Sequence, residues 1–398
     1  MMDYGNFTFH MDAEIVFGKN TESETGRLVK KYGGTKAMIV YGSGSIRKSG
    51  LYDRVAGSLT GSGIPFVDFG GVQPNPKRSF AEEGTALALK EGVDFLLGVG
   101  GGSAIDTAKA IAIGAANGGD FWRFFLGSPP DSTLPVGTIV TIAASGSETS
   151  RSLVLVDDLD TGQKKGRWCD FRPRFAIMNP ELTYSLPAHQ TAAGCVDIIS
   201  HTFMRYFSNF PSYLGDRFGE ATVRTVMKYA PIALEDPEDY AARAEILLAG
   251  SLSHCDLMAI GRPMGGAGGE HPLESQLSGH YDTAHGAGLS VMMPALLKYF
   301  TQNGSEEQVE RVAQFSINAF GISEDPAASP EDIAERGIEY FIGWLGSIGM
   351  PTSLAGLGVP ENEIPEAVDR CMKARGSKID GFMTLDEAAV SEIYYLAK

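Results

Sequence analysis

Residues 95–116, FLLGVGGGSAIDTAKAIAIGAA, decide the fold class of this chain. An apolar run at Phe95–Gly102 leads through consecutive glycines into a segment with helical periodicity, Ile105–Ala116. Glycines let backbone N–H groups approach a phosphate, and the N-terminus of a helix adds partial positive charge. We therefore predict a strand, a phosphate-binding turn and a helix, and the alternative is a tight strand–helix turn without a ligand. The residues of the predicted turn are Gly100, Gly101, Gly102 and Ser103.

Asp106 stands three residues after Ser103, which is the spacing of a capping box at a helix N-terminus. We count it with the predicted cofactor-binding residues. The turn lacks the Gly-x-Gly-x-x-Gly pattern, so it does not identify a dinucleotide by itself.

The first half of the chain alternates between strand-like and helical patterns. Strands are predicted at Lys36–Gly42, Ile64–Gly71 and Gly137–Ser145, and helices are predicted from Leu51 and at Ser79–Gly92. This alternation indicates βαβ units and a mostly parallel sheet. Ligands of such sheets bind at the carboxyl edge of the strands, where the glycine-rich turns would gather.

The pattern changes near Pro180 and Pro187, because helical periodicity runs almost without interruption from His189 to Lys398. A chain of 398 residues also exceeds the size at which one hydrophobic core stops growing. We predict an α/β, Rossmann-like dinucleotide-binding domain at residues 1–186. An all-helical metal-binding and substrate domain is predicted at residues 187–398.

Composition excludes several classes of partner. The formal net charge of −16 argues against nucleic acid and anionic membranes, because both require a basic face. There is no apolar run of about 18 residues and no signal-peptide pattern in MMDYGNFTFHMDAEI. The four cysteines lie far apart, which fits a reduced compartment. We expect a cytoplasmic protein.

A carboxylate and three imidazoles are candidates for a divalent metal site. Asp197 and His201 are four residues apart in GCVDIISHTFMRYFS, so both project from one helix face. His271 and His285 follow in HPLESQLSGHYDTAHGAG and could complete the site. A single buried histidine is more often a satisfied core residue, but this set beside a nucleotide turn favours a metal-assisted dehydrogenase. The other histidines are expected to be structural or exposed (His10, His189) or on an ordinary helix-surface or interdomain position (His254).

The turn after the first predicted strand bears on the choice of nucleotide. Gly42 stands where NAD-specific enzymes often place an acid against the ribose hydroxyls. Ser43 and Ser45 offer hydrogen-bond donors, and Arg47 and Lys48 add positive charge. This suits a 2′-phosphate and favours NADP(H) over NAD(H), unless the two cations are merely solvated surface residues.

The chain resembles the iron-containing alcohol dehydrogenase family, especially its NADP-dependent butanol dehydrogenase-like branch. The resemblance covers nearly the whole chain and rests on AEIVFGKNT, VYGSGSIRKSGLYDRV, VQPNPKRS, GVGGGSAIDTAKAIA, IAASGSETS, NPELTYSLPAHQTAAGCVDIISHTF and LSGHYDTAHGAGLSVMMP. It implies the dehydroquinate synthase-like fold with an active site between the two domains. It also implies a metal, commonly Fe(II) with Zn(II) as the other candidate, held by Asp197, His201, His271 and His285. Asn75, Thr141, Ser145 and Lys165 match positions that contact the nucleotide in the family.

One position departs from the family pattern. Many members carry a further histidine four residues after the third ligand, where this chain has Ser275. The resemblance credits that imidazole with proton relay or with lining the pocket, so Ser275 through a water, or His280, would take the role beside His285. The glycine-rich run GRPMGGAGGE, residues 261–270, suggests a flexible pocket wall.

The expected function is the interconversion of alcohols and aldehydes by hydride transfer with NADP(H), mainly as aldehyde reduction. Phe203, Phe207 or Tyr281 would favour an apolar primary substrate, although each could be plain core. Alternatives are an NAD-dependent polyol or diol dehydrogenase, a dehydroquinate synthase-like lyase, and a catalytically altered homologue in view of Ser275. The resemblance also suggests a homodimer in which the segment FTFHMDAEIVFG, residues 7–18, pairs across subunits.

Overall fold

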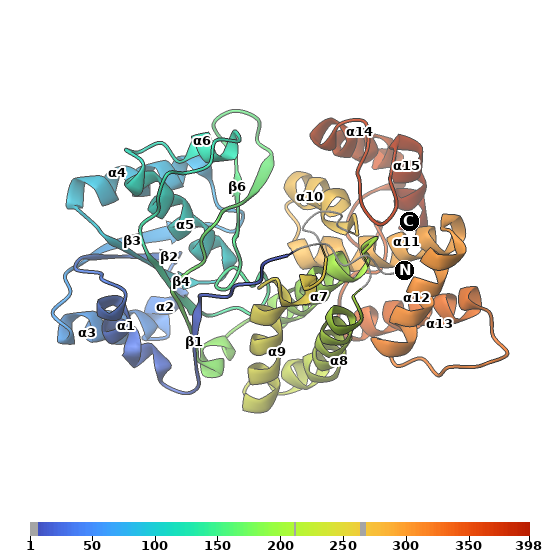
Figure 1. Ribbon diagram of the computed structural model, residues 1–398, viewed down its shortest axis with the longest axis horizontal. Helices are drawn as coiled ribbons and strands as arrows, with labels where there is room; N and C mark the ends of the chain where they lie inside the picture. Colours follow the sequence, from blue (N-terminus) through green and yellow to red (C-terminus); the bar gives the residue numbers. More distant parts are fainter. Residues whose placement is uncertain (1–6, 211, 263–267) are drawn as a thin grey trace. The chain divides into compact units, whose positions relative to one another are not determined.

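The computed structural model describes residues 7–210, 212–262 and 268–398. The chain divides into two compact units, residues 10–185 and residues 186–398, the second including the described N-terminal residues 7–9 (Figure 1). The functional roles expected for residues 1–186 and 187–398 stay predictions. No helix in the described part of the chain is both long enough and apolar enough to cross a membrane.

The first unit is built on one parallel sheet of six strands. Their order across the sheet is β1 (Glu14–Phe17), β8 (Phe175–Met178), β5 (Val136–Val140), β4 (Phe95–Gly100), β2 (Ala37–Gly42) and β3 (Phe66–Val72). The order reverses at β2, because β3 lies on one side of it and β4 on the other. Ligands of open α/β sheets bind outside the carboxyl ends of the strands at such a reversal.

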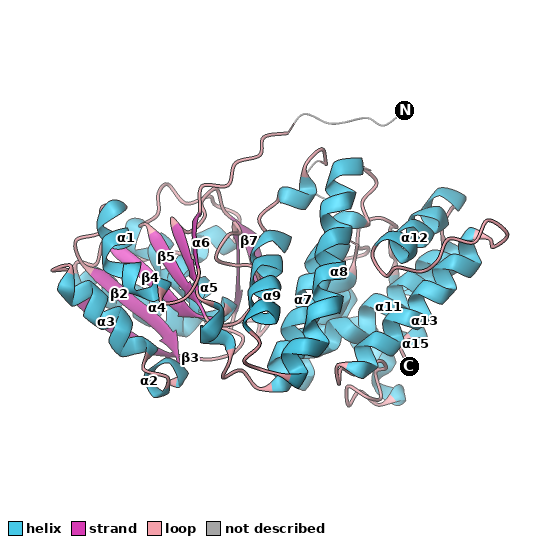
Figure 2. Ribbon diagram, turned by 90° about the horizontal axis from the view of Figure 1, so that it is seen from below, coloured by secondary structure: helices cyan, strands magenta, loops and turns pink. Residues whose placement is uncertain are grey.

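Alternating side chains of the central strands pack on opposite faces of this sheet, as the period of a strand requires. Ile39 and its face contact α1 (Thr25–Lys31) and α3 (Leu51–Gly61), whereas Val40 and the opposite face contact α4 (Arg78–Glu91) and α5 (Gly102–Ala116). Figure 2 shows the strands enclosed between helices. Each central strand is therefore buried on both sides, which explains its continuous apolar sequence.

The structure departs from the sequence pattern in two ways. One predicted strand is shorter than expected, and three strands that were not predicted follow it. The strand expected to reach Ser145 ends at Val140, and residues 146–150 form a hydrogen-bonded turn instead. An antiparallel hairpin of β6 (Ser152–Val156) and β7 (Lys164–Trp168) follows, and then β8. The N-terminal strand β1 pairs with β8 of the same chain. Pairing of residues 7–18 across a dimer stays a prediction.

The second unit is helical, as predicted. Its helices are α7 (Ala188–Tyr206), α8 (Tyr213–Glu235), α9 (Tyr240–Ser253), α10 (Glu270–Tyr281), α11 (His285–Asn303), α12 (Glu306–Asn318), α13 (Pro330–Ser347), α14 (Ile364–Arg375) and α15 (Glu387–Leu396). Nearly every residue of α7 is buried, because α8, α9 and α11 pack around it. This burial gives α7 a fixed place in the unit, and its side chains can therefore hold a precise geometry.

Of the three aromatic residues considered for substrate preference, two lie in the core. Phe203 and Phe207 are fully buried and pack with Phe315 in an aromatic core. The Tyr281 hydroxyl donates to Glu363 Oε2 at 2.6 Å and so links α10 to the segment before α14. Phe203 and Phe207 therefore match the alternative of plain core that the sequence left open for each ring.

Candidate metal centre and nucleotide turn

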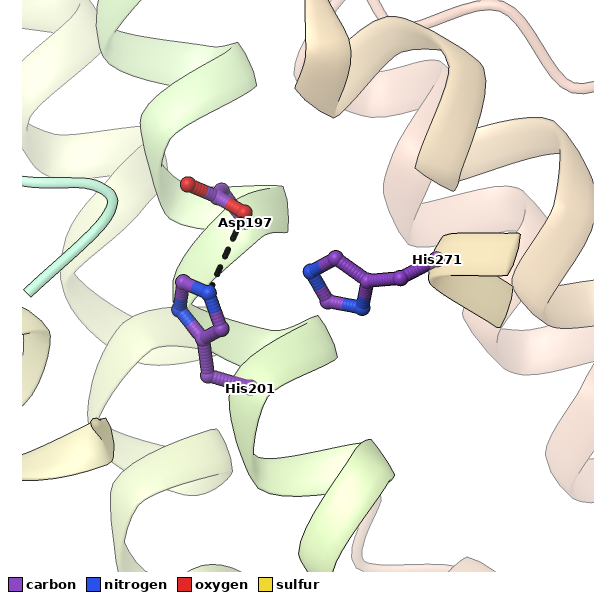
Figure 3. Close-up of side chains that lie close together, drawn as sticks. All are labelled: Asp197, His201 and His271. Atoms are coloured by element: carbon purple, nitrogen blue, oxygen red, sulfur yellow. Dashed lines mark ion pairs between the residues drawn. The ribbon is translucent and has the colours of Figure 1, made fainter. Parts of the chain in front are cut away.

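Asp197, His201 and His271 bring three potential metal donors together. Asp197 and His201 lie one turn apart on α7, and His271 is the second residue of α10. One ligand atom from each lies within 4.8 Å of the other two, and His201 Nε2 is 3.7 Å from Asp197 Oδ1. Figure 3 shows the three side chains pointing toward one another from the two helices. Donors of one tetrahedral ion stand roughly 3.4 Å apart at bond lengths near 2.1 Å, so small rotations complete such a shell.

His285 approaches the same carboxylate from a third helix. It is the first residue of α11, and its Nε2 lies 3.8 Å from Asp197 Oδ1. His285 is not part of the group formed by Asp197, His201 and His271, whose ligand atoms lie within 4.8 Å of one another. Its ring centroid is 5.2 Å from that of His271. The adjacent Gly286 explains the approach, because a Cβ there would overlap the carbonyl oxygen of Ala193 on α7. A side chain at 286 would push the two helices apart.

The buried surroundings keep His201 in the form that binds metal. Burial is the main cause that holds the pKa of His201 well below its usual range. Nearby His254, His271, Arg205 and His285 act in the same direction when charged. A histidine binds a metal through the lone pair of its neutral ring, so this environment favours ligation. Three histidines and a carboxylate with these distances fit a divalent ion that accepts nitrogen and oxygen ligands.

Two neighbours of His201 were not expected beside the candidate metal site. His254, expected on a helix surface or between domains, is buried, and its ring stacks on His201 at 4.2 Å between centroids. Arg205, one turn after His201, donates from Nη1 to the His201 carbonyl at 2.9 Å and lies 3.8 Å from Asp256. A helix-surface position for His254 is therefore wrong, because its burial depends on the packing of α9 against α7, which the local sequence does not reveal. An interdomain position stays a prediction.

The residues considered for proton relay differ in their surroundings. The Ser275 hydroxyl donates to the His271 carbonyl at 2.6 Å, one turn back along α10. His280 is exposed on the last turn of that helix, with its ring edge-on to Tyr281. Relay through either residue stays a prediction. Residues 263–267 of the glycine-rich run that was expected to form a flexible wall lie outside the described residues.

In the other unit, the glycine turn and the segment after β5 lie against each other. The Thr141 amide donates to the Gly100 carbonyl at 3.1 Å, and a Cβ on Gly102 would overlap the Ser145 side chain. Gly100 has a φ of 152°, a backbone conformation that side chains disfavour. The structure therefore joins the predicted residues Gly100, Gly101, Gly102 and Ser103 with Thr141 and Ser145 at the carboxyl edge of the sheet.

Asp106 does not form the predicted capping box. Helix α5 begins at Gly102 without a side-chain cap, and Asp106 is buried in its second turn. Its carboxylate accepts from Ser147 Oγ at 2.6 Å and from the Val154 amide at 2.9 Å. Lys109, fully buried one turn later, donates to the carbonyl oxygens of Ser147, Ser150 and Ser152 at 2.7 to 3.0 Å. Long-range hydrogen bonds thus replaced the local one that the spacing suggested.

An open pocket of ≈ 440 Å³ lies at the ends of β2 and β3 and is lined by Gly42, Ser43 and Arg47, among others. Ser45 begins the short helix α2 (Ser45–Lys48) beside it. Arg47 is anchored: its Nη2 lies 2.7 Å from Asp68 Oδ2, and its Nε donates to the Tyr41 hydroxyl at 2.8 Å. Asp68, the acid opposite Arg47, was not predicted from the sequence.

Asn75 and Lys165 are the remaining predicted nucleotide contacts. Asn75 lies three residues after the end of β3, which runs parallel to β2, so it follows the same edge of the sheet as Gly42. Its φ is 55°. Lys165 lies on β7, and its Nζ is 3.1 Å from Asp157 Oδ2. Asn75 thus follows a strand of the sheet that also carries the glycine turn, whereas Lys165 belongs to the separate β6–β7 hairpin. Nucleotide contact by either residue stays a prediction.

Comparison with known proteins places this geometry in a family. The family described as "Iron-containing alcohol dehydrogenase" matches residues 12–180, and its "Fe-containing alcohol dehydrogenase family, C-terminal" part matches residues 191–397. NADH-dependent butanol dehydrogenase B of Clostridium acetobutylicum is 37% identical over 396 residues, which cover 98% of each chain. The chain belongs to the iron-containing alcohol dehydrogenase family. The expected family and the expectation of an oxidoreductase enzyme are thereby confirmed.

Other members of the family agree on the fold and differ in the nucleotide. The crystal structure of NADH-dependent butanol dehydrogenase A from Thermotoga maritima matches with a TM-score of 0.92 and 37% identity over 100% of both chains. NADPH-dependent aldehyde reductase YqhD of Escherichia coli is 30% identical over 366 residues, which cover 90% of this chain and 91% of the relative. The predicted fold class is confirmed, and membership alone does not decide between NADH and NADPH.

Proposed function

We propose that this dehydrogenase reduces aldehydes to primary alcohols with NADP(H) and a divalent metal, Fe(II) or alternatively Zn(II). One observation carries the proposal: Asp197, His201 and His271, from two helices, present donor atoms within 4.8 Å of one another. The Nε2 atom of His285 faces the same Asp197 oxygen from a third helix. The relatives named as butanol dehydrogenases and aldehyde reductase support this substrate class.

In this proposal one unit binds the metal ion through side chains, and the other binds the nucleotide through backbone amides. When bound, the ion would supply Lewis acidity at the substrate oxygen, and the nicotinamide would supply the hydride. The buried Asp197 and His201 would hold the ion together with the partly exposed His271 and His285. The backbone amides that open α5, after Gly100 and Gly101, would bind the diphosphate at a helix N-terminus.

An absorbance assay of NADPH tests the proposed activity. Metal-free protein should oxidise NADPH with butanal after addition of Fe(II) or Zn(II), and it should lack this activity in the presence of a chelator. A panel of short-chain and longer-chain aldehydes would then define the substrate range. Metal-independent turnover, or none with any aldehyde and metal, would contradict the proposal.

The pocket at the end of β2 supports NADP(H) as the nucleotide. Residue 42 carries no acidic side chain, and the pocket has room for a phosphate beside Ser43. Lys48, in the short helix α2, is exposed. A 2′-phosphate would also lie near Arg47. Cations beside a phosphate strengthen binding through charge-assisted hydrogen bonds.

The ion pair of Arg47 with Asp68 is the observation that favours the second candidate, an NAD-dependent dehydrogenase. Because Asp68 lies 2.7 Å from the guanidinium, it offsets the charge that a 2′-phosphate would use. Its carboxylate also lines the pocket and would repel that phosphate. The ratio of kcat/KM for NADPH to that for NADH in the wild type separates the two candidates.

Replacing Gly42 tests where the adenosine ribose lies. We expect Gly42→Asp to weaken NADPH relative to NADH by about tenfold to a hundredfold, since a like charge would face the 2′-phosphate. A Cβ at residue 42 would lie 3.5 Å from the Val72 carbonyl oxygen, an ordinary contact, so the backbone tolerates the change. Gly42→Asn is the uncharged control. An unchanged preference in the aspartate variant would place the phosphate elsewhere.

A further inference from the structure

Two glutamates of α10 lie fully buried beside the two later histidines. Glu270 and Glu274 are both 0% exposed. Glu270 Oε1 is 2.9 Å from His271 Nδ1, and Glu274 Oε2 forms an ion-pair contact with His285 Nδ1. The carboxylates thus approach the ring nitrogens opposite to those that would face the ion.

The surrounding backbone leaves space for both carboxylates. A Cβ on Gly288, one turn after His285 in α11, would lie 2.6 Å from both Cγ and Oε1 of Glu274. A Cβ on Gly268 would lie 2.7 Å from Glu270 Oε2. Glycine inside a helix is less stable than alanine, so a glycine at residue 288 needs an explanation. The Glu274 carboxylate explains it, because the carboxylate occupies the space that a side chain would fill. Burial of a carboxylate is costly unless it is paired, and the imidazoles provide the pairing.

We propose that Glu270 and Glu274 are positioning residues that accept the Nδ1–H of His271 and His285 and direct both Nε2 lone pairs to the metal ion. An ionised carboxylate can only accept hydrogen bonds, so the ring nitrogen beside it must carry the proton. The neutral ring then has its lone pair on Nε2. In His285 this is the atom 3.8 Å from Asp197 Oδ1. Such carboxylate–histidine pairs orient metal ligands and raise their basicity.

His201 is oriented by different contacts. Its ring stacks with that of His254 and with that of His271, at 4.2 and 5.3 Å between centroids. Its Nδ1 has no hydrogen-bond partner among the described residues. The metal shell would therefore combine one histidine fixed by ring packing with two fixed by carboxylates. This difference predicts that the two glutamates act on metal affinity through His271 and His285.

Cobalt binding to the metal-free protein tests this inference, which rests on the proposed metal site. We expect Glu270→Gln and Glu274→Gln to weaken Co²⁺ binding by about 10- to 100-fold in a titration followed by the visible absorption of the bound ion. Gly288→Ala should act in the same direction, because its methyl group would displace the Glu274 carboxylate. Glu339→Gln, an exposed glutamate of α13 with the same charge change, is the matched control.

The outcomes separate this inference from the proposed function. Wild-type protein that binds no Co²⁺ would contradict the proposed function itself. Wild-type binding with equal affinity in the glutamine variants and the control would overturn only the positioning role. Nitrogen-15 NMR of the histidine rings gives a second readout that needs no variant. We expect the Nδ1–H tautomer at His271 and His285 in the metal-free protein, and the Nε2–H tautomer at both would overturn the inference.

Discussion

Asp197→Ala should reduce kcat/KM for aldehyde reduction by about 10³-fold or more, while the affinity for NADPH changes little. Asp197 Oδ1 is the atom that both His201 Nε2 and His285 Nε2 face, at 3.7 and 3.8 Å, so its loss removes the shared ligand of the site. A Lewis acid contributes several kcal/mol to such a reaction, which corresponds to a rate factor of this order. The glycine turn belongs to the other compact unit, so nucleotide affinity should persist.

Metal content, steady-state kinetics and NADPH fluorescence titration together check this prediction. Asp369→Ala is a suitable control, because Asp369 is an exposed residue of α14 whose ion pair with Lys373 is solvated. The control should keep wild-type metal content and rates. An equal loss of NADPH binding in the Asp197 variant would show that the two sites are not independent. Wild-type activity without bound metal would remove the assigned role of Asp197.

Lys109→Met should lower the free energy of unfolding by about 3 to 5 kcal/mol, the usual range for breaking a buried charged pair. Lys109 is fully buried, and its ammonium donates to the carbonyl oxygens of Ser147, Ser150 and Ser152. Burial lowers the pKa of Lys109, and the charge of Asp106 opposes that shift. The methionine would leave the Asp106 carboxylate and these carbonyl groups without their cation.

Urea unfolding of metal-free protein measures this effect, and Lys90→Met provides the matched control at an exposed position in the last turn of α4. The control should change stability by less than about 0.5 kcal/mol. We also expect the Lys109 variant to bind NADPH more weakly, because residues 145–152 would lose the bonds that fix them near the glycine turn. Stability equal to that of the control would mean that the pair contributes no net free energy.

The parts of the site that the sequence predicted follow from local geometry. Asp197 and His201 could be paired because four residues make one helical turn, and α7 confirms that they share a face. The strand, glycine turn and helix from Phe95 to Ala116 could be identified because apolar patterning and glycine act over a few residues. His271 and His285 could be named as candidates for the same site, but their distance along the chain left only the resemblance to a family to join them with Asp197.

The parts that were missed or wrong depend on contacts between distant residues. His254 resembles an ordinary helix residue until α9 packs against α7 and stacks its ring on His201. Asp106 had the spacing of a capping box, but its hydrogen bonds to Ser147 and Val154 connect residues more than forty positions apart. Glu270 carried one usable signal, because it stands beside the predicted ligand His271 and carboxylates are frequent partners of ligand imidazoles. Glu274 carried none, because its partner His285 is eleven positions away.

The sequence by itself determined most of the helices, the central strands and the set of candidate site residues, because propensity, periodicity and glycine content act within one helix or strand. The tertiary structure alone decided which charges are buried, which acid faces Arg47, and which carboxylates reach His271 and His285. The physical reason is that desolvation and hydrogen-bond pairing depend on the neighbours that packing brings within a few ångströms, and those neighbours come from distant parts of the chain.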